Sequence, residues 1–213
     1  MANGFNQVVI ANSDTPDHQD LYRFVDGEGI LTAIRIAEDL PPDAVFNDYH
    51  VASGVSVRYF ARAYLTAGSS GGYTDSDATD AITGDLDGLW ITEVTTDSTT
   101  TNAAQSLNLF ITGARRIPQY ESESRKFDGR TAELTIFGQQ TGLVLSYDVV
   151  VPLAEISKLE TLQSLLDANT TLCIRDNLGN RMFGRLNSIP FSDLIVGDFF
   201  SLTFLEEDFD EEV

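Results

Sequence analysis

Alternating hydrophobic and polar positions run through most of the chain and predict a protein built mainly from β-strands. In the clearest stretch, residues 55–64, Arg58 and Arg62 can face outward while Val57 and Tyr59 face a core. Polar, glycine-rich turns separate these stretches, as they do in all-β proteins. The pattern predicts strands at 7–11, 30–37, 55–64, 89–94, 106–111, 132–137, 143–151, 171–175, 181–186 and 199–204.

One segment, residues 154–166, instead has the period of an amphipathic helix. Pro152 can open this helix and Asn169 can end it. Its apolar stripe consists of Ile156, Leu159, Leu162, Leu165 and Leu166. The predicted fold class is therefore all-β, with two β-sandwich-type modules, of which the second has one packed helix.

A polar stretch near the middle of the chain predicts the boundary between the two modules. Residues 95–104 contain no large apolar side chain, so they cannot anchor to a core and are typical of a linker. The predicted organisation is an N-terminal arm at 1–20, a first module at 21–94, the linker at 95–104, a second module at 105–205 and an acidic tail at 206–213.

The chain is strongly acidic, with a formal charge of −20 from 13 basic and 33 acidic residues. Nucleic acid and anionic membrane surfaces are not expected as partners, because both attract clustered Lys and Arg. No apolar run approaches the roughly 20 residues that a membrane-spanning helix needs, so no membrane insertion is expected. The first residues lack the pattern of a signal peptide, which predicts folding in the cytosol of the producing cell.

The residue types that usually carry chemistry are scarce. Cys173 is the only cysteine and lies in an alternating segment, so we interpret it as a small buried hydrophobe. His18 and His50 have no second ligand at metal spacing and are interpreted as exposed loop histidines. The acidic loop Asp75–Asp80 departs from the ligand pattern of a calcium-binding EF-hand. We expect no catalytic residue, no cofactor and no metal site.

The acidic C-terminal tail is the candidate interface. It contributes Glu206, Glu207, Asp208, Phe209, Asp210, Glu211 and Glu212. One interpretation is solubility through self-repulsion, and the other is a docking segment for a basic partner. Under the second, the free tail is extended, its acids lie along a basic groove on a neighbouring subunit, and Phe209 fills an apolar pocket there.

Several segments, taken in order, resemble minor tail proteins of siphophages that infect actinobacteria. They are Val45–Tyr64, Leu89-Trp90 with the polar linker behind it, Arg125–Gly138, Thr171–Leu186 and the closing strand Phe199–Asp208. The resemblance implies that the first module is a fibronectin III-like β-sandwich. It also implies that the second is a distal-tail-like or tail-tube-like module.

This resemblance implies a non-enzymatic structural component of the virion tail, made in the host cytoplasm. The implied partners are other phage tail proteins, within a homo-oligomeric ring of three- or sixfold symmetry. An alternative function is that of a carbohydrate-binding β-sandwich that contacts host cell-surface glycans. That function needs exposed aromatic rings, for which Tyr64, Tyr73 and Trp90 are the candidates.

Overall fold

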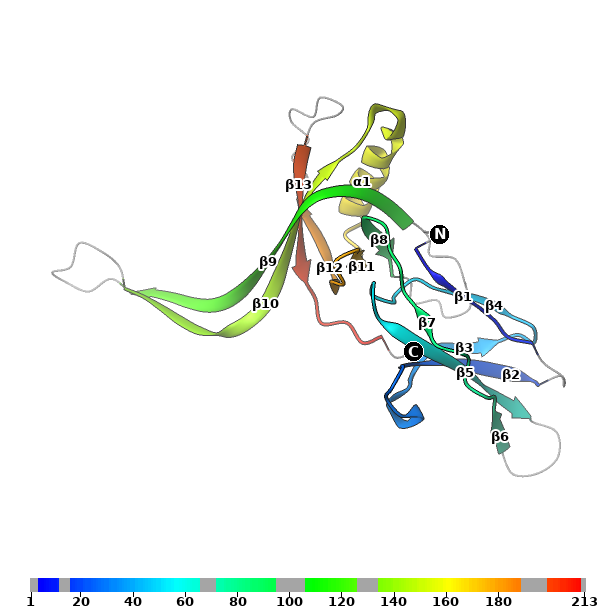
Figure 1. Ribbon diagram of the computed structural model, residues 1–213. Coiled ribbons are helices and arrows are strands. Elements are labelled where there is room, and N and C mark those ends of the chain that lie inside the picture. The colour runs from blue at the N-terminus through cyan, green and yellow to red at the C-terminus, as the bar shows by residue number, and fades with distance from the viewer. Residues whose placement is uncertain are drawn as a thin grey trace. The chain divides into compact units, whose positions relative to one another are not determined.

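The computed structural model describes residues 4–11, 16–65, 72–94, 106–125, 134–188 and 199–211 (Figure 1). Most of these residues lie in strands, and α1 is the one α-helix among them. The elements in chain order are β1 Asn6–Val9, β2 His18–Val25, a 3₁₀ helix Ile30–Thr32, β3 Ile34–Leu40, β4 Val45–Asp48, β5 Ser56–Leu65, β6 Gly72–Asp75, β7 Ile82–Thr83, β8 Leu89–Glu93, β9 Ser106–Arg125, β10 Leu134–Val150, a 3₁₀ helix Leu153–Glu155, α1 Ser157–Ala168, β11 Leu172–Asp176, β12 Arg181–Ser188 and β13 Phe199–Glu206.

The strand pairing confirms a mostly β protein with a helix, but it does not give two β-sandwiches. β1 and β4 form a two-stranded sheet. A second sheet has the order β3-β2-β5-β6, with β7 also paired to β5. The remaining six strands close into a barrel in the order β10-β13-β12-β11-β8-β9.

The chain folds into two compact units, each made from separate segments of sequence. Unit 1 consists of Met1–Leu109, Leu172–Met182 and Phe209–Val213, and unit 2 consists of Phe110–Thr171 and Phe183–Asp208. These units are not the two predicted modules, which followed one another along the sequence. The reason is that β8 pairs along its length with β11, and β11 comes after β9, β10 and α1 in the chain. The predicted linker at 95–104 lies outside the described residues.

The core of unit 1 lies on one face of the β3-β2-β5-β6 sheet. Leu21, Ala37, Val57 and Tyr59 from this sheet pack in one buried cluster with Val8 of β1. The predicted inward positions of β5 are therefore confirmed. The pattern search missed β2, which contributes one strand of this sheet, because four of its eight residues are polar or charged.

The helix of unit 2 uses only part of its predicted stripe. Leu162 and Leu165 are buried, whereas Ile156 is 48% exposed and precedes the α-helix. Asn169 ends the helix as predicted, in the left-handed conformation at φ 50°. In the same unit, the ring of Tyr147 on β10 meets that of Phe204 on β13 edge-on.

A turn lies between the predicted strands 171–175 and 181–186 and is closed by a buried carboxylate. Asp176 accepts hydrogen bonds from the backbone N–H groups of Leu178 and Asn180 and from the Asn180 side chain. Gly179 has φ 90°, the left-handed conformation that glycine adopts without strain. Cys173, three residues earlier, is fully buried as predicted, and burial raises the pKa of its thiol to about 12.

Candidate functional site

Most of the tail residues picked out by sequence follow directly from β13. Glu206 is the last residue of that strand and is exposed, and Glu207 forms an ion pair with Arg185 of β12. Asp208 and Asp210 are exposed, whereas Phe209 is half-buried. Glu212 lies outside the described residues.

Glu211 is held by two arginines of its own chain, within unit 1. Its Oε1 accepts hydrogen bonds from Nη2 of Arg23 at 2.6 Å and from Nη1 of Arg181 at 3.1 Å. Its Oε2 lies 2.9 Å from Nη2 of Arg181. The prediction of a free tail is therefore wrong at Glu211, whose side chain is only 12% exposed. The two arginines come from β2 and β12, so no local pattern reveals them as a pair.

On its other side, Arg23 is bound to a second buried carboxylate. Nη1 of Arg23 donates to both oxygens of Asp48 at 3.0 and 2.8 Å. The hydroxyl of Tyr59 donates to Asp48 at 2.9 Å, and the side-chain amide of Asn6 donates to that hydroxyl at 3.1 Å. Arg23 thus lies between Asp48 and Glu211. These two carboxylates supply the hydrogen-bond acceptors and the negative charge that its almost fully buried guanidinium needs.

His50 and Arg181 form the more exposed side of this network. The backbone N–H of His50 donates to Asp48 at 2.9 Å, and its Nδ1 lies 3.5 Å from Oε1 of Glu211. Nη1 of Arg181 also donates to the backbone carbonyl of His50 at 3.1 Å. His50 is therefore half-buried against the tail and is not an exposed loop histidine. His18 lies in β2, stacked on Tyr64, and not in a loop.

The pKa values follow from this arrangement. Burial alone would raise the pKa of Glu211, but the hydrogen bond from His50 and the charges of Arg23 and Arg181 lower it to about 2. Burial would also raise the pKa of Asp48, yet the charge of Arg23 keeps it below its usual range. Both carboxylates are therefore ionised at neutral pH.

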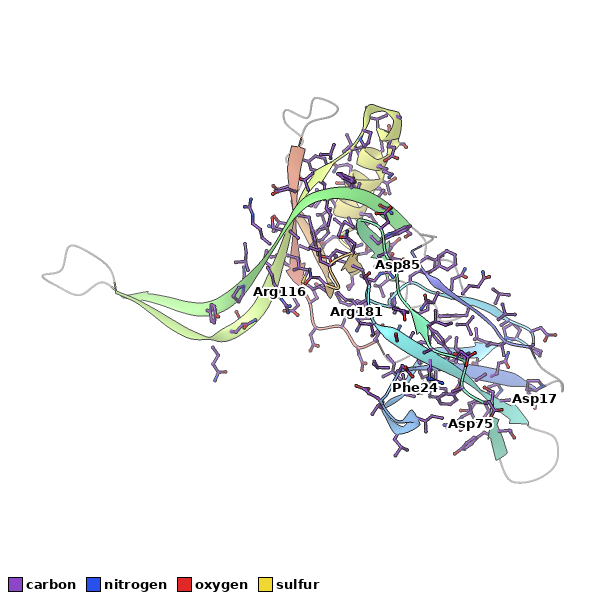
Figure 2. The ribbon with its side chains drawn as sticks, viewed as in Figure 1. Asp17, Phe24, Asp75, Asp85, Arg116 and Arg181 are labelled. Atoms are coloured by element: carbon purple, nitrogen blue, oxygen red, sulfur yellow. The ribbon has the colours of Figure 1, made fainter. Side chains whose placement is uncertain are left out.

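A cavity of about 310 Å³ adjoins the network in unit 1. Arg23, Arg181 and Glu211 line one part of it, and apolar side chains such as Phe24 and Val57 line the rest. Figure 2 labels Phe24 and Arg181. We call the group of Arg23, Arg181 and His50 the tail site, because it binds a carboxylate of the C-terminal tail.

A second buried arginine, Arg175 of β11, serves a different purpose. It donates hydrogen bonds to the backbone carbonyls of Val51, at 3.1 Å, and of Gly4, at 2.7 Å. Burial lowers the pKa of Arg175. Its bonds tie the N-terminal segment and the loop after β4 to β11 within unit 1.

In unit 2, β9 and β10 form a long two-stranded ribbon (Figure 1). β13 pairs with β10 only from Val144 onward. Beyond that point, among the residues that the structure describes, Pro118–Arg125 and Leu134–Leu143 pair only with each other. This part is about 25 Å long, at roughly 3.3 Å per residue. The sequence predicted separate strands at 106–111, 132–137 and 143–151, so the length of the ribbon was missed.

Large apolar side chains and basic side chains stand out from this ribbon. On β9, Phe110, Ile117 and Tyr120 are 65%, 48% and 50% exposed. Tyr120 lies in the part that β13 does not reach, Ile117 borders that part, and Phe110 lies where β10 also pairs with β13. Arg115 and Arg116 are exposed beside them, and Figure 2 places Arg116 on the ribbon. Residues 115–130 hold 5 of the 13 basic residues and only 3 acids, in a chain of net charge −20.

Of the three aromatic residues considered for sugar binding, Trp90 is buried, and Tyr64 and Tyr73 each have one ring face against a neighbouring side chain, although Tyr73 remains 56% exposed. Trp90 is only 9% exposed and its indole N–H donates to the Asp87 carbonyl at 3.1 Å, so it is a packed aromatic residue of β8. Tyr64 stacks on His18 at 4.7 Å between ring centroids. The guanidinium of Arg62 lies 4.1 Å from the ring centre of Tyr73.

Within the part of the chain that the structure describes, no cluster of three or more His, Cys, Asp or Glu side chains could hold a metal ion. In the same residues, no helix is both long and apolar enough to cross a membrane. The sequence matches no protein-family model and no curated protein. The function must therefore be inferred from the chain's own residues and geometry.

Proposed function

We propose that this chain is a structural subunit of a bacteriophage tail that assembles with copies of itself and with other tail proteins. The observation that carries the proposal is the β9–β10 ribbon. Two strands that pair only with each other are marginally stable in water, so a ribbon of this length calls for a partner surface. Its two outer edges also carry unpaired backbone groups that a further strand can bind.

The side chains of the ribbon favour another copy of the chain as that partner. Burying the exposed parts of Phe110, Ile117 and Tyr120 would contribute roughly 3 kcal/mol in total. Arg115 and Arg116 would meet an acidic surface on a second copy, because the chain as a whole carries −20. Self-assembly through a ribbon is compatible with a mostly β tail subunit, the class that the sequence resembles.

Sedimentation velocity over a range of protein concentrations tests the ribbon. The wild-type chain should self-associate, and Ile117→Lys combined with Tyr120→Lys should weaken association at least about tenfold, which corresponds to about 1.4 kcal/mol. The matched control is Leu178→Lys, which changes an apolar side chain that is 66% exposed on the turn after β11. Equal weakening in the control, or a monomeric wild type at every concentration, would exclude the ribbon as the interface.

Electron microscopy of purified phage particles labelled with an antibody to this chain tests the location. Label on the tail supports the proposal, and its absence from the particle contradicts it. The alternative, a carbohydrate-binding protein, is less favoured because Trp90 is buried and one ring face of Tyr64 and of Tyr73 is covered within unit 1, which leaves Tyr73 as the exposed ring among the three candidates. A glycan array separates the two functions: specific glycan binding that Tyr73→Ala abolishes would favour the alternative.

A further inference from the structure

The tail site has the properties of a receptor for a separate acidic segment. It presents two guanidinium groups and the Nδ1 of His50 to one carboxylate, and its deepest member, Arg23, is fixed by Asp48. Its occupant, Glu211, lies five residues beyond the end of β13. Residues 207–211 have no regular secondary structure, so the segment that carries Glu211 can follow a different path without breaking a sheet.

We propose that the tail site also accepts the C-terminal tail of a second copy of the chain, so that tails are exchanged between neighbouring subunits in the assembly. This inference rests on the proposed function, because it requires copies that lie side by side. The exchanged tail would be a second contact between copies, separate from the contact made by the ribbon.

Two arguments favour a second copy as the source of the tail. The first is that exchange preserves every contact, because each copy supplies both a tail and a site; this is the usual basis of segment swapping. The equilibrium between the two arrangements then depends on the effective concentration of the neighbouring tail, which assembly raises.

The second argument is electrostatic. Two chains of net charge −20 repel each other, so their interface needs local attraction. An exchanged Glu211 would turn its ion pairs with the buried Arg23 and with Arg181 from contacts within one chain into contacts between two chains, without leaving either charge unpaired. Burial of this ion pair shields it from salt more than an exposed pair would be.

A conservative variant makes the exchange visible by mass spectrometry. Arg181→Lys keeps the positive charge and provides an amine that a carbodiimide can couple to the Glu211 carboxylate. The full-length variant is prepared with and without nitrogen-15, and equal amounts are unfolded together, refolded and cross-linked. Trypsin then leaves residue 181 in the peptide 176–185 and residue 211 in the peptide 186–213, so each cross-link reports which chains it joined.

If tails are exchanged, about half of the cross-links between residues 181 and 211 should join a heavy and a light chain, since partners are drawn at random. Cross-links confined to chains of one isotope would overturn the proposal. Glu211→Gln in the same background is the control and should remove this cross-link. Sedimentation of the same mixture separates the two proposals. Self-association without mixed cross-links refutes exchange alone, whereas a sample that stays monomeric refutes the proposed assembly as well.

Discussion

Glu211→Gln removes one negative charge from the tail site and should destabilise unit 1. Each pKa unit corresponds to about 1.4 kcal/mol of differential interaction. The fall of the Glu211 pKa from 4.5 to about 2 therefore corresponds to about 3 kcal/mol of folding free energy at neutral pH. Asp48 still pairs with Arg23 in this variant, so the loss should be limited to about that amount.

The loss should also depend on pH in a definite direction. Because folding lowers the pKa of Glu211, its stabilising effect is fully present above pH 4.5 and disappears as the pH falls through about 2. The difference between wild type and variant should thus shrink from about 3 kcal/mol at pH 7 to about 1.5 kcal/mol at pH 3.

Urea unfolding followed by tryptophan fluorescence is the appropriate assay. Trp90 is the only tryptophan, and it is buried in unit 1, so its emission reports on the unit that holds the tail site. Urea is preferred to guanidinium chloride because added salt screens charges. Glu206→Gln, an exposed position, is the matched control and should change stability by less than about 0.5 kcal/mol. A Glu211→Gln loss as small as the control's, or one unchanged by acid, would refute the reasoning.

Three further predictions concern other parts of the chain. Leu162→Asp should destabilise unit 2 by at least about 3 kcal/mol because it buries a charge. Ile156→Asp, at an exposed position, should lower the free energy of unfolding only slightly. Urea unfolding followed by circular dichroism compares the two variants. Gly184→Ala should cost about 1–3 kcal/mol in the same assay, because its Cβ would lie 2.0 Å from a backbone carbonyl of β13, whereas Gly142→Ala meets nothing closer than 4.0 Å. Calorimetric titration should detect no calcium site tighter than about 10 μM, because the Asp75–Asp80 loop lacks the ligand pattern; a tighter site would contradict this prediction.

The spacing of apolar residues along the sequence predicted buried positions correctly where one face of a strand or helix is apolar. The alternation in β5 and the stripe in α1 predicted Tyr59 and Leu162 as core residues, and both are fully buried. It failed for β2, in which Asp20 and Arg23 are buried polar residues with partners on other strands. A period-two pattern recognises only apolar burial, so a strand whose buried positions include an ion pair goes unnoticed.

The candidate site was predicted only in part. The acidic run correctly drew attention to Glu211, but a run of like charges does not reveal which acid is bound. Its partners, Arg23, His50 and Arg181, are 188, 161 and 30 residues away in sequence, and they converge only through tertiary folding. The exposed ribbon was missed for a related reason, since β9 continues well past its apolar residues, through Arg115 and Arg116.

The division of unit 1 into three segments has a consequence for folding during synthesis. Its first strands leave the ribosome early, but β11 is made only after residues 110–171, and Glu211 only after 183–208. During synthesis, Asp48 is therefore available to Arg23 long before Glu211 is, and we expect the non-local pairings to form slowly. A chain that terminates before residue 211 never completes the network, so it should be marked for degradation by its lower stability.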